Sequence, residues 1–334
     1  MKPPFLLFLG DVTDPLEAKT ALGLVQWRPE DCVGQLRFSN GRVDTGLPDM
    51  DIRQACRAGA RSIVIGVAPA GGVLKPDWEQ TLAHALDAGL DVVSGMHTPL
   101  AEVPRIANAA YRSGRRLVDV RQPPEELPVA TGRRRGGRRL LTVGTDSCVG
   151  KKTTALALHR GLRRAGVPAT FRATGQTGIM IAGAGIALDG VPAGFIAGAA
   201  ERLSPDNDPE HWDVIEGQGA LAHPAWAPVT LGLLHGSQPD LLVLCHDPLR
   251  RAIEGFSGFP LPSLQESMAR YLEAARLTNP DVRFAGISLN TAHCTPSERR
   301  TQLIRAADET GLPCVDPLAR GVEPLVEVVQ HWQP

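Results

Sequence analysis

The chain has 334 residues, of which 43% are hydrophobic and 21% charged, and its formal net charge is −1 at pH 7. This composition is typical of a globular protein long enough for two domains, and the balanced charge gives no reason to expect a nucleic-acid or membrane partner. No apolar run approaches the length of a membrane span, and the six cysteines lack the spacing of a zinc site or a disulfide framework. We therefore expect a cytoplasmic protein without a structural metal.

Residues 1–122 alternate short apolar runs with segments of helical spacing. The predicted strands are Phe5–Leu9, Ser62–Val67, Leu90–Val93 and Arg116–Val120, and the predicted helices are Pro15–Leu24, Trp78–Ala88 and Leu100–Tyr111. Apolar runs separated by helices predict a parallel sheet covered on both faces, which makes this a Rossmann-like α/β domain. The turn of residues 66–72 ends a strand, and it is equally consistent with a structural turn and with part of a substrate site.

Residues 123–138 are predicted to be a linker. They hold three prolines, and five arginines interrupted by glycines occupy the stretch 132–139. Such a basic run is a candidate for RNA or anion binding, but its place directly before a strand favours a solvated connection between domains.

A second α/β domain is predicted over residues 139–334. Its strands are expected at Leu140–Val143, Ala169–Arg172, Asp213–Glu216, Leu241–Cys245, Phe284–Leu289 and Pro313–Val315, with helices at Thr153–Ala165, Leu264–Leu277 and Ser297–Thr310. The alternation again predicts a parallel sheet, here of the P-loop NTPase-like kind because of the glycine-rich turn that follows its first strand.

That turn is the most informative segment of the chain. A glycine-rich loop between a strand and a helix directs several backbone N–H groups, and the positive end of the helix, into one small space that attracts phosphate. A lysine adds a mobile charge, and a following hydroxyl is able to bind Mg²⁺. The residues expected to bind the phosphates are Gly144, Thr145, Asp146, Ser147, Cys148, Val149, Gly150, Lys151, Lys152, Thr153 and Thr154.

The loop resembles that of dethiobiotin synthetase and its relatives, with one departure. Lys152 stands where those proteins have a threonine, so the hydroxyl is displaced to Thr153 or Thr154. A second resemblance is the segment Trp212–Gly219, in which a strand delivers Glu216 and then two glycines. If a magnesium nucleotide binds, Glu216 and Thr153 are the expected metal ligands, since Mg²⁺ prefers carboxylates and hydroxyls that leave several waters in place.

Further polar residues follow the other strands of this domain. Arg172 ends the second strand, and Gln176 and Thr177 follow it as possible donors to a carboxylate or an acyl oxygen. His223, and the pair His246 and Asp247, follow the next strands, and each histidine is as consistent with a structural role as with that of a base. The remaining candidates are Asn290, for a purine edge, and Arg250 and Arg320.

Together these motifs resemble a bacterial P-loop family long labelled a domain of unknown function, over nearly the whole chain. Members of this family are known as D-glutamate N-acetyltransferases, so the resemblance implies transfer of acetyl from acetyl-CoA to the amine of D-glutamate in D-amino-acid catabolism. It implies a coenzyme A cradle at the P-loop and a small amino-acid substrate. The implied catalytic residues are His223, His246, Asp247, Gln176 and Glu216, and the implied substrate-binding residues are Arg172, Thr177, Arg250 and Arg320.

Two other functions are consistent with the same loop. An ATP- and Mg²⁺-dependent ligase or kinase-like enzyme would use Lys151 and Glu216 directly, although Lys152 at the hydroxyl position counts against it. A non-catalytic nucleotide sensor or accessory chaperone is supported by the modified loop alone. P-loop proteins of this group often form dimers across the nucleotide site, which implies a homo-oligomer.

Overall fold

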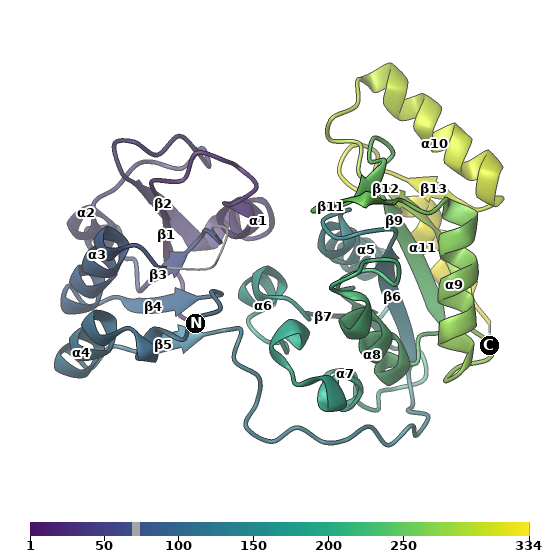
Figure 1. The fold of residues 1–334 in the computed structure, drawn as a ribbon, viewed down its shortest axis with the longest axis horizontal. Helices are drawn as coiled ribbons and strands as arrows, with labels where there is room; N and C mark the ends of the chain where they lie inside the picture. The colour runs from purple at the N-terminus through teal and green to yellow at the C-terminus, as the bar shows by residue number, and fades with distance from the viewer. Residues whose placement is uncertain (69–73, 334) are drawn as a thin grey trace. The chain divides into compact units, whose positions relative to one another are not determined.

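The computed structural model describes residues 1–68 and 74–333, which form two compact units. The first comprises Met1–Pro123 together with Gln176–Ala187, and the second comprises Pro124–Gly175 together with the chain from Leu188 onward. Each unit is built on its own parallel sheet (Figure 1). The turn predicted at residues 66–72 falls largely outside the described residues.

The first unit is a five-stranded parallel sheet in the order β2-β1-β3-β4-β5. The interior strand β1, between β2 and β3, is buried at every position, as expected for a strand covered on both faces. Figure 1 shows α2, α3 and α4 on one face of this sheet and α1 on the other. The bounds are β1 Phe5–Gly10, α1 Lys19–Trp27, β2 Cys32–Arg37, α2 Ile52–Arg57, β3 Ser62–Ile65, α3 Pro76–Asp87, β4 Asp91–Ser94, α4 Pro104–Ser113 and β5 Leu117–Asp119.

Local sequence signals set several of these boundaries. Asp51 and Gln54 form a reciprocal capping box at the start of α2. Helix α4 has Pro104 in its first turn, where a missing N–H costs nothing, and it ends at Gly114 in the left-handed conformation. Trp78 of α3 is fully buried against the sheet, where it meets Phe8 edge to face at a centroid separation of 5.4 Å.

The α1 face of the first unit is completed by a helix from much later in the chain. Helix α6, Gln176–Ala182, packs against α1. The hydroxyls of Thr20 and Thr177 share a hydrogen bond of 2.9 Å, and Arg28 donates to the backbone oxygen of Ile181 at 3.0 Å. A side chain at Gly95 would collide with Gln176 at 2.8 Å. The sequence prediction divided the chain once, near residue 122, and did not anticipate this excursion.

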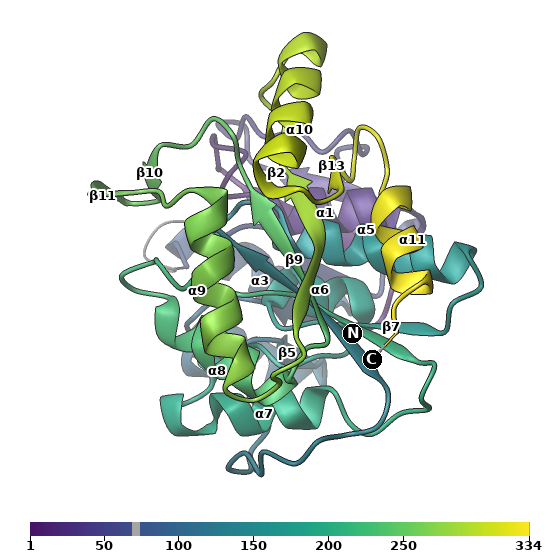
Figure 2. The same cartoon turned by 90° about the vertical axis from the view of Figure 1, so that its right-hand side faces the viewer.

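The second unit is a six-stranded parallel sheet in the order β13-β12-β9-β6-β8-β7. Figure 2 shows α8 and α9 on one face and α5 and α11 on the other, while α7 packs on α8. A small antiparallel hairpin follows β9. The bounds are β6 Arg138–Gly144, α5 Lys151–Arg164, β7 Ala169–Arg172, α7 Ile196–Leu203, β8 Trp212–Ile215, α8 Ala227–Ser237, β9 Leu241–His246, β10 Ala252–Ile253, β11 Phe256–Pro260, α9 Leu264–Arg276, β12 Arg283–Leu289, α10 Pro296–Thr310, β13 Cys314–Val315 and α11 Glu323–Gln330.

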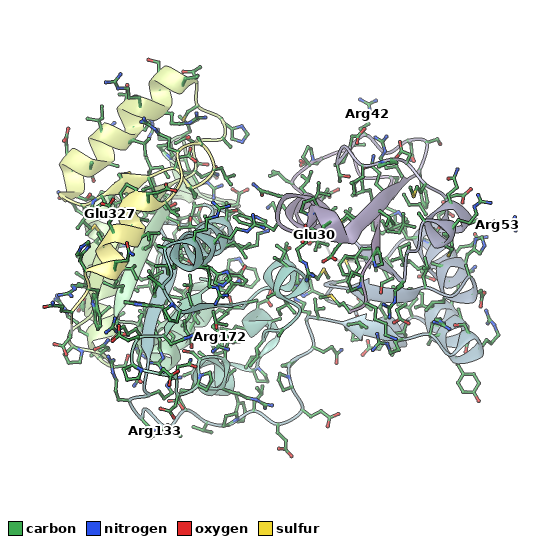
Figure 3. All side chains as sticks on the ribbon, turned by 180° about the vertical axis from the view of Figure 1, so that it is seen from behind. Glu30, Arg42, Arg53, Arg133, Arg172 and Glu327 are labelled. Atoms are coloured by element: carbon green, nitrogen blue, oxygen red, sulfur yellow. The ribbon has the colours of Figure 1, made fainter. Side chains whose placement is uncertain are left out.

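The arginine run is not the solvated linker that its composition predicts. Arg133 is exposed, as Figure 3 shows, but Arg135 and Arg139 are 7% and 1% exposed. Arg135 donates from Nη1 and Nη2 to backbone oxygens of Glu201 and Gly236, which satisfy these two ends of the buried guanidinium, while its Nε has no hydrogen-bond partner among the described residues. Only part of the run is therefore on the surface, and its last two residues already belong to β6.

The described residues include no helix with both the length and the apolar content needed to cross a bilayer. Charged side chains such as Arg42 and Arg53 are exposed on the first unit (Figure 3).

Candidate functional site

Four loops meet at the carboxyl edge of the second sheet. β6 leads into the glycine-rich loop 144–150, β8 into Glu216, β9 into His246 at its end, and β12 into Asn290. Because β8 and β9 flank β6 directly, Glu216 and His246 lie on either side of the glycine-rich loop. Open α/β sheets bind ligands at this edge, so the topology alone places the cluster where a site is expected.

The glycine-rich loop has the backbone of an anion cradle. Its φ angle is +56° at Cys148 and +100° at Gly150, a left-handed conformation that lets successive N–H groups converge. The Lys151 ammonium donates to the backbone oxygen of Asp146 at 2.7 Å. The Ser147 hydroxyl is buried and finds no hydrogen-bond partner among the described residues. An anion in the loop would supply partners for both groups.

Lys151 is a buried cation at the first position of α5. Burial lowers the pKa of its ammonium, while Cys245, Cys148 and Asp146 act in the opposite direction. A buried charge is costly unless it is paired. A bound phosphate would provide the pairing and favour the charged form of the lysine. The Lys151 ammonium is therefore stabilised most when an anion occupies the loop.

Asp146 anchors the loop to the segment that follows β9. Its carboxylate is fully buried and accepts hydrogen bonds from Arg250 Nη1 and from the backbone N–H of Glu254, both at 2.8 Å. Arg250 Nη1 also donates to the backbone oxygen of Ser147 at 2.7 Å, and its Nη2 lies 3.0 Å from the Glu254 carboxylate. The guanidinium expected to clamp a substrate carboxylate is thus engaged in shaping the phosphate loop.

The two threonines after the lysines differ in their surroundings. The Thr154 hydroxyl is buried, donates to Gly150 at 3.0 Å and meets the Ser288 hydroxyl at 2.8 Å. It also accepts from the Cys245 thiol at 3.4 Å, so it faces the sheet and contributes to helix–strand packing. Thr153 is half-buried, and it is the hydroxyl left as a ligand for a metal or a phosphate.

Glu216 does not lie in solvent at the end of its strand. Its side chain is 3% exposed, and its Oε2 accepts backbone hydrogen bonds from Thr174 at 3.0 Å and Gly175 at 3.2 Å. Burial raises the pKa of this carboxyl to about 7, although Lys152, the two backbone amides and Lys151 all act to lower it. The lysines of the loop and this carboxylate therefore form one electrostatic group.

His223 has a fixed tautomer that conflicts with a role as a base. Its Nδ1 accepts hydrogen bonds from the backbone N–H groups of Ala225 and Trp226 at 3.1 and 3.3 Å. The lone pair on Nδ1 is therefore occupied, and the proton of the neutral ring is on Nε2. Burial lowers its pKa, so the neutral ring persists. His223 is suited to donate a hydrogen bond rather than to accept a proton.

His246 is the histidine that retains the chemistry of a base. Its Nδ1 lies 3.0 Å from the Thr145 hydroxyl, and burial lowers its pKa to about 4, with Asp247 opposing the shift. The ring is neutral at physiological pH, and Nε2 carries a lone pair in the tautomer in which Nδ1 donates to Thr145. Asp247 accepts from the backbone N–H of Leu249 at 3.0 Å, so its first role is in the turn after β9.

Aromatic side chains line the same region. The ring of His223 lies edge to face with Phe256 of β11 at 5.3 Å and 6.2 Å from Trp226. Phe256 in turn meets Phe259 at 6.1 Å. Trp226, directly before α8, and Phe259 of β11 are 42% and 51% exposed. With Phe256 they form an aromatic rim, part of which lies on the β10–β11 hairpin that Asp146 binds through the Glu254 N–H.

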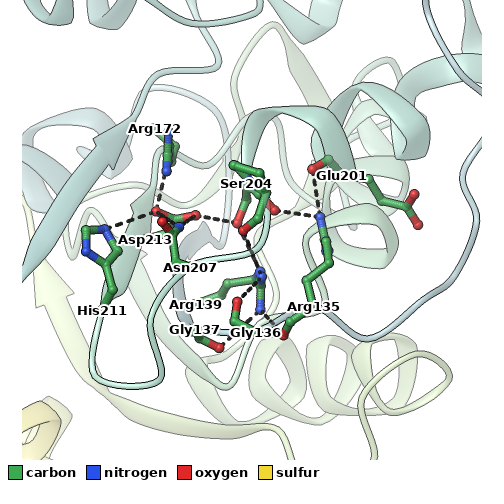
Figure 4. A network of polar contacts seen from close by, with 11 residues as sticks. Arg135, Gly136, Gly137, Arg139, Arg172, Glu201, Ser204, Asn207, His211 and Asp213 are labelled. Atoms are coloured by element: carbon green, nitrogen blue, oxygen red, sulfur yellow. Dashed lines mark hydrogen bonds and ion pairs between the residues drawn. The ribbon is translucent and has the colours of Figure 1, made fainter.

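Arg172, expected to clamp a substrate carboxylate, belongs to a different cluster. Arg172 is the last residue of β7, and its backbone oxygen accepts from the N–H of Glu216 at 3.0 Å. Its side chain turns back along the sheet, where Nε donates to the buried Asp213 carboxylate at 2.8 Å within the network of Figure 4. Gln176 and Thr177, expected as donors beside the phosphates, belong to the first unit through α6. The substrate-binding role expected of Arg172 and Thr177 and the catalytic role expected of Gln176 stay predictions.

The last two candidates follow β12 and β13. Asn290 approaches the glycine-rich loop, since a Cβ added at Gly150 would lie 3.8 Å from the Cβ of Asn290. Its side-chain oxygen accepts from the backbone N–H of Ala292 at 3.3 Å. Arg320 is exposed in the loop after β13, a strand that lies three places from β6, roughly 14 Å at 4.8 Å per strand. Both lie on the β12–β13 side of the phosphate loop.

Sequence reasoning missed two supports of the loop. Tyr271 of α9 is buried and donates its hydroxyl hydrogen to the Gly144 oxygen at 2.8 Å, while accepting from the Leu221 N–H at 3.2 Å. Gly217 donates its N–H to the Thr142 hydroxyl at 3.0 Å, and any side chain there would strike the Thr142 backbone oxygen. Gly217, the first of the two glycines after Glu216, was a usable signal for close packing, whereas nothing near Tyr271 indicated its role.

The two units match the two parts of one family model. Residues 36–123 match the N-terminal Rossmann-like domain of DUF1611, a domain of unknown function, and residues 128–326 match its C-terminal P-loop domain. The chain belongs to the DUF1611 family. A crystal structure of a DUF1611 family protein from Anabaena variabilis is 35% identical, covers 99% of this chain and all of that one, and superposes with a TM-score of 0.90. The fold is thus shared along the whole length.

Two curated relatives carry a functional name. A protein from Tritonibacter scottomollicae named D-glutamate N-acetyltransferase is 45% identical over 329 residues, 98% of this chain and 99% of the relative. A protein of the same name from Pseudoalteromonas sp is 45% identical over 326 residues, 98% of each chain. These relatives indicate an acetyltransferase enzyme, as the family resemblance in the sequence implied.

Proposed function

We propose that this protein transfers the acetyl group of acetyl-CoA to the amine of D-glutamate. The observation that carries the proposal is full-length similarity to two enzymes of that name, in a chain whose phosphate loop has Lys152 at the usual metal-binding hydroxyl. An acyl transfer from coenzyme A uses the loop as an anion cradle and requires no phosphoryl chemistry. Lys151 and the loop N–H groups would then bind the coenzyme diphosphate.

The strand order suggests how the coenzyme lies across the sheet. With the diphosphate over β6, its adenosine would extend towards β12 and β13, where Asn290 is placed to read the purine edge. Coenzyme A carries a 3′-phosphate on its ribose that ATP lacks. Arg320, exposed after β13, is a candidate partner for this phosphate, so we reassign it from the substrate carboxylates to the coenzyme.

The thioester arm would extend the other way, over the aromatic rim of Trp226, Phe256 and Phe259. The β10–β11 hairpin, which carries Phe256 and Phe259, is linked to the phosphate loop by Asp146, and the exposed rings of Trp226 and Phe259 offer apolar contact to a pantetheine chain. The arm would bring the thioester near His223, whose Nε2–H is available for the carbonyl oxygen. Binding of the phosphates and of the arm would therefore use contiguous parts of one unit.

The reaction needs an unprotonated amine and stabilisation of a developing oxyanion. The amine nitrogen attacks the thioester carbonyl, the C–N bond forms, and the C–S bond breaks to release the coenzyme thiolate, which takes up a proton. His246 is the candidate to receive the proton of the ammonium, because its ring is neutral and one lone pair can be free. His223 is the candidate donor to the oxyanion. Their roles are thus distinguished by tautomer.

The test is release of free thiol from acetyl-CoA with D-glutamate, with and without Mg·ATP, and identification of the product by mass. Thiol release and N-acetylglutamate without ATP would establish the transferase. ADP formation from acidic substrates without thiol release would favour an ATP-dependent ligase instead. Acetyl-3′-dephospho-CoA is the informative second donor: we expect the variant R320A to raise the KM for acetyl-CoA severalfold while leaving that of the dephospho donor unchanged.

A further inference from the structure

Residues 176–187, which we call the excursion, belong to the first unit and interrupt the second. Thr174 binds the chain of the second unit on both sides of this interruption. Its backbone N–H donates to the Glu216 carboxylate at 3.0 Å, and its backbone oxygen accepts from the N–H of Leu188 at 3.0 Å. Its hydroxyl donates to the Glu216 backbone oxygen at 2.7 Å. All the polar groups of Thr174 therefore hold the two ends of the excursion against the end of β8.

Neighbouring groups complete this arrangement, which we call the clasp: Thr174, Gly175, Leu188, Glu216 and Gln218. The Glu216 Oε2 also accepts from the Gly175 N–H at 3.2 Å, and Gln218 Nε2 donates to the Thr174 hydroxyl at 3.0 Å. A Cβ at Gly175 would lie 2.5 Å from Gln218 Nε2, so a larger residue there would displace the Gln218 amide. The carboxylate oxygen Oε2 is thus an acceptor for two backbone amides at the point where the chain leaves the unit.

The clasp is in contact with the phosphate loop through one lysine. A Cβ on Gly217, the residue after Glu216, would lie 3.0 Å from Cδ of Lys151, so the lysine stem runs along this strand end. Both Lys151 and Lys152 interact electrostatically with the Glu216 carboxyl. A change in the position or pairing of these lysines therefore changes the electrostatic environment of the carboxylate that holds the excursion.

We propose that Glu216 is a positioning residue: it fixes the base of the excursion beside the phosphate loop, and so sets where the chain that carries Gln176 and Thr177 begins. The two amides at Oε2 favour this role over that of a metal ligand. The kinetic part of the proposal rests on the acetyltransferase function, whereas the structural part does not. Glu216 thereby connects the phosphate loop to the backbone of residues 174–175, where the chain leaves the second unit.

Hydrogen–deuterium exchange on the full-length, ligand-free protein tests the structural part. We expect E216A to increase exchange across residues 174–188 at least tenfold, because the amides of Thr174 and Gly175 lose their acceptor. E216Q keeps an acceptor oxygen and should retain most of the protection. The matched control is D316N, since Asp316 accepts two backbone amides at the same sheet edge, from Leu318 and Ala319 at 3.0 and 2.9 Å. Its effect should stay within its own loop.

Two results would overturn the proposal: wild-type exchange at 174–188 in E216A, or equal loss of protection in E216Q and E216A. If E216A does not fold, E216D replaces it, because the shorter side chain draws the carboxylate away from the amides of Thr174 and Gly175, and unchanged exchange in that variant is equally decisive. In the transferase assay E216A should lower kcat about tenfold with the KM for acetyl-CoA within twofold of wild type, and E216Q should recover most of the rate. A metal ligand would instead lose Mg²⁺-dependent nucleotide binding in both variants. Absence of any acetyl transfer would refute the proposed function and leave the exchange result to decide on the clasp.

Discussion

The two edges of the second sheet carry polar clusters of opposite character. At the amino edge, Asp213 is 1% exposed and is bound by Arg172 at 2.8 Å and by the Ser204 hydroxyl at 2.6 Å, and Ser204 in turn accepts from Arg139 at 3.0 Å (Figure 4). At the carboxyl edge, Lys151 turns to a backbone oxygen and the Ser147 hydroxyl is buried without a partner among the described residues. The amino-edge groups are bound mainly to one another, although Arg135 Nε and His211 Nε2 lack a hydrogen-bond partner among the described residues, whereas the unused bonding capacity at the carboxyl edge belongs to the phosphate loop.

Whether a charged group has its partners within the fold distinguishes structural from ligand-binding residues better than residue type does. Arginine, aspartate and histidine occur at both edges, and the sequence gives no reason to rank one above the other. Buried ionic networks serve folding when each member has its partners, whereas a site must leave groups to be satisfied by what it binds. Mutations at the amino edge should therefore change stability, and those at the carboxyl edge should change activity.

The largest expected effect is at the amino edge. D213A leaves the Arg172 guanidinium and the Ser204–Arg139 pair without their buried acceptor, which should cost about 3–5 kcal/mol of unfolding free energy. Urea denaturation would measure this loss. E210A is the control, because Glu210 is 74% exposed in its pair with Arg138 and should contribute less than about 1 kcal/mol. A fall in the kcat/KM of the folded D213A protein would contradict the division between the edges.

His223 should have the largest effect on catalysis. H223A removes the Nε2–H donor, and loss of one oxyanion donor lowers kcat by about 100-fold or more. H223Q retains a side-chain N–H and should recover part of the rate. The limb of the pH–rate profile on which activity rises with pH should keep its position in both variants. Displacement of that limb, with H223Q as inactive as H223A, would restore His223 as the base.

The raised pKa of Glu216 predicts a pH-dependent stability of defined sign. The native state holds this proton to about pH 7, whereas the unfolded chain releases it near the ordinary value of 4.5. The contribution is therefore fully present below pH 4.5 and is lost as the pH rises through 7, a change of about 3 kcal/mol. The free energy of unfolding of wild type should fall relative to E216Q between pH 5 and 8. Parallel curves for the two proteins would refute the assignment.

Substitution of Lys151 should have the smallest of these effects, and the effect should be on the binding of acetyl-CoA. K151A removes a charged hydrogen bond to the coenzyme phosphates, worth about 1.5–3 kcal/mol, so the KM for acetyl-CoA should rise at least tenfold. Stability should not fall, because the variant relieves a buried cation. K152A serves as the neighbouring control and should have a weaker effect on KM. Destabilisation of K151A by more than 1 kcal/mol would show that this lysine is structural.

Much of the fold followed from local sequence, because parallel strands buried on both faces leave apolar runs that are easy to recognise. The strand Ala169–Arg172 and the glycine-rich loop were predicted with nearly the bounds that the structure gives. The placement of Glu216, His246 and Asn290 at one edge also follows from strand endings alone. These are features in which the pattern of a few neighbouring residues determines the position.

The rest depended on partners distant in sequence. Arg135 is buried because backbone oxygens about 100 residues away, at Gly236 and Ser237, are free to accept its hydrogen bonds. Helix α6 joins the first unit through contacts with α1, which its own short apolar sequence does not specify. The tautomer of His223 is set by two backbone amides, whose direction no residue type encodes. Each of these features is a property of the folded chain.

The excursion through α6 has a consequence for how such proteins are inherited and engineered. A gene fragment that ends at the proline-containing connection encodes a first unit without the helix that completes its α1 face, while the remainder encodes a second unit with a loose twelve-residue insertion, 176–187. Neither fragment is a self-sufficient module, so exchange of halves between relatives should fail unless the excursion travels with the half it packs against. We expect the two units to have changed together, as a single heritable block.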